Sequence, residues 1–153
     1  MIVVYTNQKI SPGKKSIFLA GPTPRKKEVP SWRLKAIKIL KEKDFDGVVY
    51  IPENPSGGIV DNLVERSLWE RKALAAATVI LFWIPRQFPD LPAFTTNVEF
   101  GYWLHTKKII YGRPDNAKKI KYLDWLYQHD YNKKPFNNLN DLITEAIKMA
   151  NRK

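Results

Sequence analysis

The run Thr78-Val79-Ile80-Leu81-Phe82-Trp83, followed by Thr95-Thr96-Asn97-Val98-Glu99-Phe100-Gly101, decides the fold of this chain. The first run is continuous and apolar, which is typical of a strand buried on both faces of a parallel sheet. The second leads into a helix-like segment from about Thr96 to Thr106. In an open α/β sheet, ligands bind beyond the carboxyl ends of the strands. The carboxylate of Glu99 is therefore predicted to lie where a ligand would bind.

Strand and helix patterns alternate along the rest of the chain. Strand patterns cover Ile2–Tyr5, Ser16–Ala20, Val48–Ile51 and Lys108–Tyr111, and helix patterns follow Ser31 and cover about Asp61–Ala77, Asp115–Gln128 and Leu139–Asn151. This alternation predicts βαβ units in a three-layer α/β sandwich with a mainly parallel sheet. Without a repeat or a linker, residues 1–153 are predicted to form a single domain. The Ser11-Pro12-Gly13 turn signal predicts that the first strand forms either a hairpin or an edge strand.

Two helix patterns predict which residues face the core. In the first helix Ser31 can act as the N-cap. The predicted core positions are Leu34, Ile37 and Leu40 in the first helix and Val60, Val64, Leu68, Leu74 and Ala75 in the second.

Composition limits the class of protein. The chain has 153 residues, 44% of them hydrophobic, and no cysteine, so disulfides and cysteine nucleophiles are excluded and one domain with a real core is expected. We find neither a signal peptide nor an apolar run long enough to span a bilayer. These features predict a protein of the cytoplasm with no membrane association.

The chain is strongly basic, with 26 Lys and Arg against 15 Asp and Glu. Such a charge attracts polyanions or phosphate-bearing small molecules. Many of the lysines lie on helix faces that are expected to be solvated, and no nucleic-acid-binding motif is present. Nucleic-acid binding is accordingly the least favoured interpretation of the charge.

Glu99 has two competing interpretations. Thr96 and Glu99 have the spacing of a capping box, a purely structural role that the local pattern alone favours. Catalysis is the alternative, because Thr95, Thr96 and Tyr102 lie three or four residues from Glu99 on a helix. A helix N-terminus would keep the carboxylate ionised and available as a nucleophile.

Two further segments carry candidate site residues. The strand ending at Ala20 is followed by Gly21, Pro22 and Arg25; glycine permits close approach of a ligand, and the arginine can meet a phosphate or carboxylate. Glu70, after Trp69, lies near the middle of its helix, where an acidic residue most often faces solvent. An ordinary strand exit and a solvated glutamate are the structural alternatives.

Other catalytic classes find no support. His105 and His129 are far apart and have no second ligand at metal-binding spacing, so no metal site is predicted. Neither Ser56 nor Ser67 has the context of a nucleophile elbow.

Taken together, four segments resemble the nucleoside 2-deoxyribosyltransferase-like proteins and their nucleotide N-glycosidase relatives. The segments are Ser16-Ile-Phe-Leu-Ala-Gly-Pro22, Trp69-Glu70, Val79-Ile-Leu-Phe-Trp-Ile-Pro85 and Thr96-Asn-Val-Glu-Phe-Gly101. Their order and spacing cover about Ser16 to Trp125. The resemblance implies a flavodoxin-like fold, no cofactor, and a homodimer or larger homo-oligomer in which a neighbouring subunit contributes to the site; Tyr122 and Asp124 lie in the region that would contribute.

The resemblance also implies roles for particular residues. Glu99 matches the glutamate that attacks the anomeric carbon, and Glu70 is the nearest match to a second acidic residue that assists at the sugar or base. Gly21, Pro22 and Arg25 match the loop that lines the sugar or phosphate subsite, and Thr95, Thr96, Asn97 and Tyr102 are expected to contact substrate. The transferases carry an aspartate for the base about six residues before the nucleophile, and this chain has Ala93 there.

These observations predict an enzyme that cleaves or exchanges the N-glycosidic bond of a nucleoside or nucleotide through a covalent intermediate on Glu99. The sequence leaves open whether water or a second base completes the reaction. A non-catalytic module of the same fold that binds or senses nucleotides is the alternative, and it predicts binding without release of base.

Overall fold

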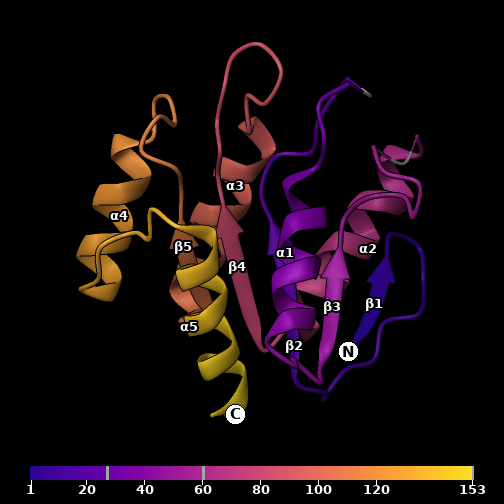
Figure 1. Cartoon of the computed structure of the whole chain (residues 1–153). Coiled ribbons are helices and arrows are strands. Elements are labelled where there is room, and N and C mark those ends of the chain that lie inside the picture. The colour runs from indigo at the N-terminus through magenta and orange to yellow at the C-terminus, as the bar shows by residue number, and fades with distance from the viewer. Residues whose placement is uncertain (27, 60, 153) are drawn as a thin grey trace.

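A single sheet of five parallel strands forms the centre of the molecule, in the order β1-β3-β2-β4-β5 (Figure 1). The structure is a computed structural model that describes residues 1–26, 28–59 and 61–152. The strands are β1 (Ile2–Tyr5), β2 (Ser16–Ala20), β3 (Val48–Ile51), β4 (Val79–Trp83) and β5 (Ile109–Gly112). The helices are α1 (Trp32–Glu42), α2 (Leu63–Ala76), α3 (Phe94–Trp103), the 3₁₀ turn η1 (Leu104–Thr106), α4 (Lys121–Tyr131) and α5 (Leu139–Asn151). The predicted α/β class and parallel sheet are confirmed, and the arrangement is flavodoxin-like.

Helices cover both faces of the sheet, as a parallel sheet requires. In β2, Ile17 and Leu19 pack with α1 and α5, whereas Phe18 and Ala20 pack with α2, α3 and α4. All four side chains are fully buried. The continuous apolar pattern of the central strands therefore follows from their having a core on each side.

The N-terminal strand is an edge strand. β1 pairs in parallel with β3, with Ile2 opposite Val48 and Tyr5 opposite Ile51. A parallel pair cannot be closed by a tight turn, so the hairpin alternative is wrong. The Ser11-Pro12-Gly13 segment instead belongs to the long connection that leads to the far side of β3.

The first helix begins where the sequence predicts, but the set of residues that it turns toward the core differs from the predicted set. The side chain of Ser31 accepts a hydrogen bond from the backbone N–H of Arg33 at 3.2 Å and caps the helix. The buried residues of α1 are Arg33, Ala36, Ile39 and Leu40, and Leu34 is 64% exposed. The prediction that Leu34 faces the core is therefore wrong for this chain taken alone.

The second helix shows the same discrepancy more strongly. Val64 and Leu68 are 66% and 54% exposed, and Ala75 is also exposed. The residues that α2 buries are Trp69, Ala73 and Leu74, so of the predicted stripe only Leu74 is confirmed. Val60 lies outside the described residues. In the part of the chain that the structure describes, no helix is both long and apolar enough to cross a membrane.

Candidate active site

The candidate site is a pocket at the carboxyl edge of the sheet, beside the ends of β2 and β4. The chain passes from β2 to β3 on one side and then crosses to β4 on the other, so the strand order reverses between β2 and β4. Doubly wound sheets bind ligands at such a switch point. The pocket is lined by Gly21, Pro22, Thr23, Arg25, Pro52, Ile59, Arg66, Glu70, Pro92, Ala93, Phe94, Thr95, Thr96 and Glu99. In Figure 1 the connections that follow β3 and β4 rise above the arrowheads of these strands.

Gly21 shapes the floor of the pocket. Its φ is +149°, and a Cβ at this position would overlap the carbonyl oxygen of Trp83 and crowd the ring of Trp32. Glycine is therefore required by close packing of the β2 exit against the end of β4, as well as by its backbone conformation. The loop consequently starts at a fixed point on the lining of the pocket.

Arg33 holds this loop from below. Its side chain is 1% exposed. Nε donates to the carbonyl of Leu19 at 2.9 Å and Nη2 donates to the carbonyl of Gly21 at 2.7 Å. Nη1 donates to the hydroxyl of Thr23 at 3.2 Å and forms an ion pair with Glu53 at 2.6 Å. Burial lowers the pKa of Arg33, and the negative charge of Glu53 opposes that effect. One guanidinium thus ties the β2 loop to the residue that follows β3.

The start of α3 is not a capping box. The helix begins at Phe94, after Ala93 in the left-handed conformation with φ of +57°, and no side chain caps it. Thr96 is buried inside the helix, and Glu99 lies more than a turn beyond its first residue. The capping-box interpretation is therefore wrong, because the helix begins before the residue that was expected to cap it.

Glu99 and Glu70 form the chemical centre of the pocket. Their side chains are hydrogen-bonded to each other, which brings α3 and α2 together at this point. Burial, the negative charge of Glu70 and the hydrogen bond with Glu70 raise the pKa of Glu99 to about 8, against the opposing effect of Arg33. Burial also raises the pKa of Glu70, while Arg66 at 3.8 Å and Arg33 oppose this. At neutral pH the pair therefore shares one proton.

This result corrects two expectations. Glu99 was expected to be kept ionised by the helix N-terminus, but its position beyond the first turn removes that benefit and its neighbour is another carboxylate. The structural alternative for Glu70 was a side chain that faces solvent, yet the side chain is only 17% exposed. Trp69 explains this placement: it is buried, and its Nε1 donates to the carbonyl of Gln8 at 2.8 Å. The anchored ring leaves the next residue at the pocket.

The structure brings most of the candidate residues together. Glu99, Glu70, Gly21, Pro22, Arg25, Thr95 and Thr96 all line the pocket. Arg25 is exposed and has no hydrogen-bond or ion-pair partner among the residues that the structure describes. A free cation therefore stands beside the carboxyl pair.

Asn97 and Tyr102 do not line the pocket. The amide oxygen of Asn97 accepts a hydrogen bond from Arg86, a buried residue at the base of the β4–α3 connection. The hydroxyl of Tyr102 accepts from Arg71 at 3.1 Å on the outer face of α3. The expected contacts of these two residues with substrate are therefore not supported by the lining of the pocket.

Asp124 and Tyr122 lie in the region where a neighbouring subunit was expected to contribute to the site. Asp124 has partners within the chain, and Tyr122 lies at the surface. Asp124 accepts from the hydroxyl of Tyr111 at 2.9 Å and pairs with Arg113 at 2.9 Å. Tyr122 is 69% exposed and stacks on Trp125, with ring centroids 5.8 Å apart.

Sequence reasoning missed Arg66 and the whole Arg33 network. Arg66 lines the pocket one helical turn before Glu70 and pairs with it, so an i,i+4 spacing was the available signal. For Arg33 the sequence gives no signal, because its partners, which are backbone carbonyls and the side chains of Thr23 and Glu53, belong to other segments of the chain. In the described residues no group of three or more His, Cys, Asp or Glu side chains could hold a metal ion.

The chain is similar to a known protein family. A family model described as nucleoside 2-deoxyribosyltransferase like matches residues 14–117, which include both glutamates and the Gly21 loop. None of the curated proteins that were compared matches the chain.

Proposed function

The chain belongs to the nucleoside 2-deoxyribosyltransferase-like family, and from this premise we propose that it cleaves or exchanges the N-glycosidic bond of a (deoxy)nucleoside or nucleotide through a covalent intermediate on Glu99. The observation that carries the proposal is the hydrogen-bonded pair of Glu99 and Glu70 in a pocket at the switch point of the sheet. Buried titratable groups with strongly shifted pKa values cluster at catalytic sites.

The shared proton suggests how the reaction proceeds. When substrate binds, Glu99 passes its proton to Glu70 and becomes a carboxylate. Its oxygen forms a bond to the anomeric carbon while the C–N bond breaks and the electron pair leaves with the base. Glu70 delivers the proton to the departing base, which leaves as a neutral molecule. Glu70 is then an ionised base.

The second half of the reaction restores the pair. Water, or the N–H of an incoming base, attacks the anomeric carbon and gives its proton to Glu70, and the bond to Glu99 breaks with the electron pair returning to the carboxylate. One proton again resides on the pair. Hydrolysis and transfer differ only in the attacking molecule.

Other pocket residues fit the binding of a sugar. The hydroxyl of Thr95 and the backbone beside Gly21 and Pro22 can bond sugar hydroxyls, while Arg25 and Arg66 supply positive charge to an anionic substituent. The residue that would handle the base is replaced by Ala93, which lines the pocket without a polar side chain. Base recognition therefore relies on groups other than an acidic side chain at that position.

A nucleotide-binding module without catalysis is the second candidate. The raised pKa of Glu99 favours this candidate, because a protonated carboxyl is a poor nucleophile until its proton has moved. This candidate predicts tight binding of a nucleotide with no release of base.

We also propose that the protein is a homodimer through the layer of α2, α3 and α4. This layer exposes eight of the large hydrophobic side chains: Leu63, Val64, Leu68, Phe94, Val98, Tyr102, Tyr122 and Trp125. On α3 the exposed side chains carry no charge, and Gly101 has no atom near the position of a Cβ, so another backbone can approach closely. A stable interface takes about 800 Å² from each partner, and a face with this many exposed apolar side chains suits an interface of that kind.

Phe94 links this face to the pocket, since it is 62% exposed and also lines the pocket. A subunit seated on the face would therefore cover one rim of the site. We also propose that the protein acts in the cytoplasm.

The decisive experiment compares wild type with Glu99→Gln on a panel of deoxynucleosides, ribonucleosides and their 5′-monophosphates. Free base is measured by chromatography, and the glycosyl adduct by the mass of the intact protein. Glu99→Gln should abolish both while retaining the fold. Glu65→Gln is the matched control, because Glu65 is exposed on α2 and does not line the pocket. Undiminished turnover by Glu99→Gln would refute the proposal, and binding without base release by wild type would favour the sensor.

A further inference from the structure

A second cavity adjoins the active-site pocket. Its volume is about 890 Å³, within the range that small-molecule sites occupy. It lies between the loop after β2, the loop after β3 and the first turns of α1. Arg25 and Ile59 line both this cavity and the active-site pocket. The two spaces therefore meet at Arg25.

The cavity contains a buried carboxylate with a vacant acceptor. Glu53 is 4% exposed and lines the cavity. Its Oε1 accepts from Ser31 at 2.8 Å and from Arg33 at 2.6 Å. Its Oε2 has no hydrogen-bond partner among the described residues. This oxygen is not one of the fully buried atoms that lack a partner, so it is accessible from the cavity. The hydroxyl groups of a sugar are the donors that such a carboxylate binds, as the acidic residue of dinucleotide-binding folds binds a ribose.

The walls and the rim of the cavity differ in chemistry. Val29, Leu34, Ile37 and Pro55 give it an apolar wall, which suits the face of a planar base. Arg25 and Lys26 stand at the rim. Lys26 is paired with Asp90 at 2.8 Å, whereas Arg25 has no such partner among the described residues. The cation that remains available thus lies between the two cavities.

We propose that the second cavity is a subsite for the distal half of a dinucleotide substrate. The ribose of that half bonds Glu53, its base lies against Leu34 and Ile37, and the bridging phosphates meet Arg25. The scissile N-glycosidic bond belongs to the other half, which occupies the active-site pocket above Glu99. This inference rests on the proposed function for the identity of that bond, and on the second cavity for everything beyond it.

The test uses three substrates that share one base: the nucleoside, its 5′-monophosphate and the diphosphate-bridged dinucleotide. Wild type should release base from the dinucleotide with kcat/KM about tenfold higher than from the monophosphate, as expected for one extra hydrogen bond to a charged group. Leu34→Trp should remove that ratio, because the larger ring occupies the space against Leu34 and Ile37 where the base would lie. Lys35→Trp is the matched control, because Lys35 is exposed beside it and lines neither cavity, and it should keep the ratio.

Calorimetric binding separates this inference from the proposed function. If no substrate releases base, the proposed function fails, and the subsite still predicts that the dinucleotide binds about tenfold more tightly than the monophosphate, with the difference lost in Leu34→Trp. Equal affinity of wild type for the two ligands, or an unchanged difference in Leu34→Trp, would overturn the subsite whether or not base is released. Circular dichroism of each variant verifies that the fold is intact.

Discussion

Arg33→Met should destabilise the protein by about 3–5 kcal/mol, the cost of removing one partner of a buried ion pair. The guanidinium is 1% exposed and Glu53 is 4% exposed, so neither charge is screened by water. The substitution leaves Glu53 without its cation and also removes the donors to the carbonyls of Leu19 and Gly21. For a domain of this size the melting temperature should fall by roughly 6–20 °C.

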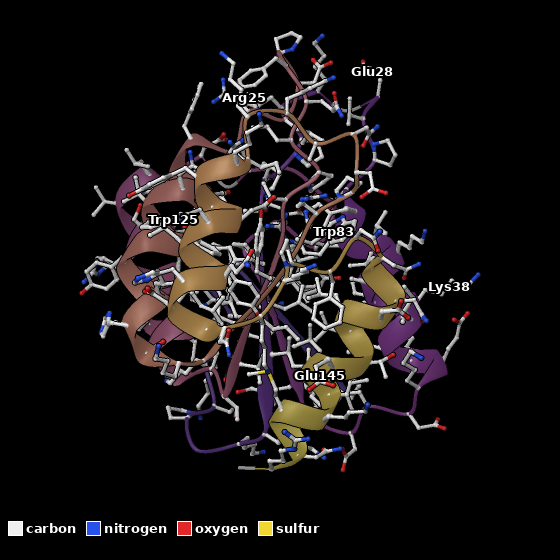
Figure 2. All side chains as sticks on the ribbon, turned by 90° about the vertical axis from the view of Figure 1, so that its left-hand side faces the viewer. Arg25, Glu28, Lys38, Trp83, Trp125 and Glu145 are labelled. Carbon is white, nitrogen blue, oxygen red and sulfur yellow. The ribbon has the colours of Figure 1, made fainter. Side chains whose placement is uncertain are left out.

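Urea unfolding, followed by tryptophan fluorescence, measures the loss in the free energy of unfolding. Two further variants separate the contribution of the buried charge from that of an ordinary surface pair. Adding Glu53→Gln to Arg33→Met removes the uncompensated charge and should recover part of the stability, while the loop carbonyls remain without donors. Lys38→Ala is the control on the same helix, because its pair with Glu42 is exposed and long, at 3.8 Å; Figure 2 shows Lys38 pointing into solvent. It should cost under about 0.5 kcal/mol. A loss below about 1 kcal/mol in Arg33→Met would refute the role assigned to this network.

Three other predictions follow from the site and the apolar face. Gly21→Ala should lower the free energy of unfolding in urea by about 1–3 kcal/mol, because the new Cβ overlaps the carbonyl oxygen of Trp83. Gly13→Ala is the control and should cost less, since Gly13 has a φ of +76° and no atom within 4 Å of the position of a Cβ. Equal losses in the two variants would contradict the packing argument. The raised pKa of Glu99, about 8, means that the folded state binds a proton that the unfolded state releases near 4.5. The unfolding free energy of wild type relative to Glu99→Gln should therefore fall as pH rises from about 4.5 to 8, by at most about 1.4 kcal/mol per pH unit, and a flat difference would show that Glu99 is ionised throughout. Val98→Lys should convert a dimer into a monomer, since Val98 is 71% exposed at the centre of the uncharged face of α3. Sedimentation velocity measures this change, and an unchanged sedimentation coefficient would place the interface elsewhere.

The sequence predicted most of the elements because their patterns are local. Helix α5 runs from Leu139 to Asn151 as predicted, since Leu142, Ile143 and Ala146 form a buried stripe and Asn138 caps the first turn. Pairing is not local. Nothing in Ile2–Tyr5 indicates that its partner is β3, more than forty residues away, so the hairpin alternative could not be removed from the sequence.

The site was predictable where it depends on residue type and position, as for Glu99 and the Gly21 loop. It was not predictable where it depends on contact between segments. Thr96 was expected to cap α3, and the helix begins earlier because the β4–α3 connection enters through Ala93 in the left-handed conformation. The raised pKa of Glu99 could not be foreseen, because it depends on burial of the side chain and on the charge of Glu70 on another helix.

The apolar residues that the sequence assigned to the core and the structure exposes have one physical explanation. A 3.6-residue period reports that a face avoids water, and it does not say which molecule covers that face. Val64 and Leu68 lie on the layer where we propose a second subunit, and Leu34 lies on the wall of the second cavity, where we propose a base. In both places the pattern and the structure agree if burial is completed on binding. Substitutions at Val98 and Leu34 therefore test the same argument twice, once against a partner subunit and once against a ligand.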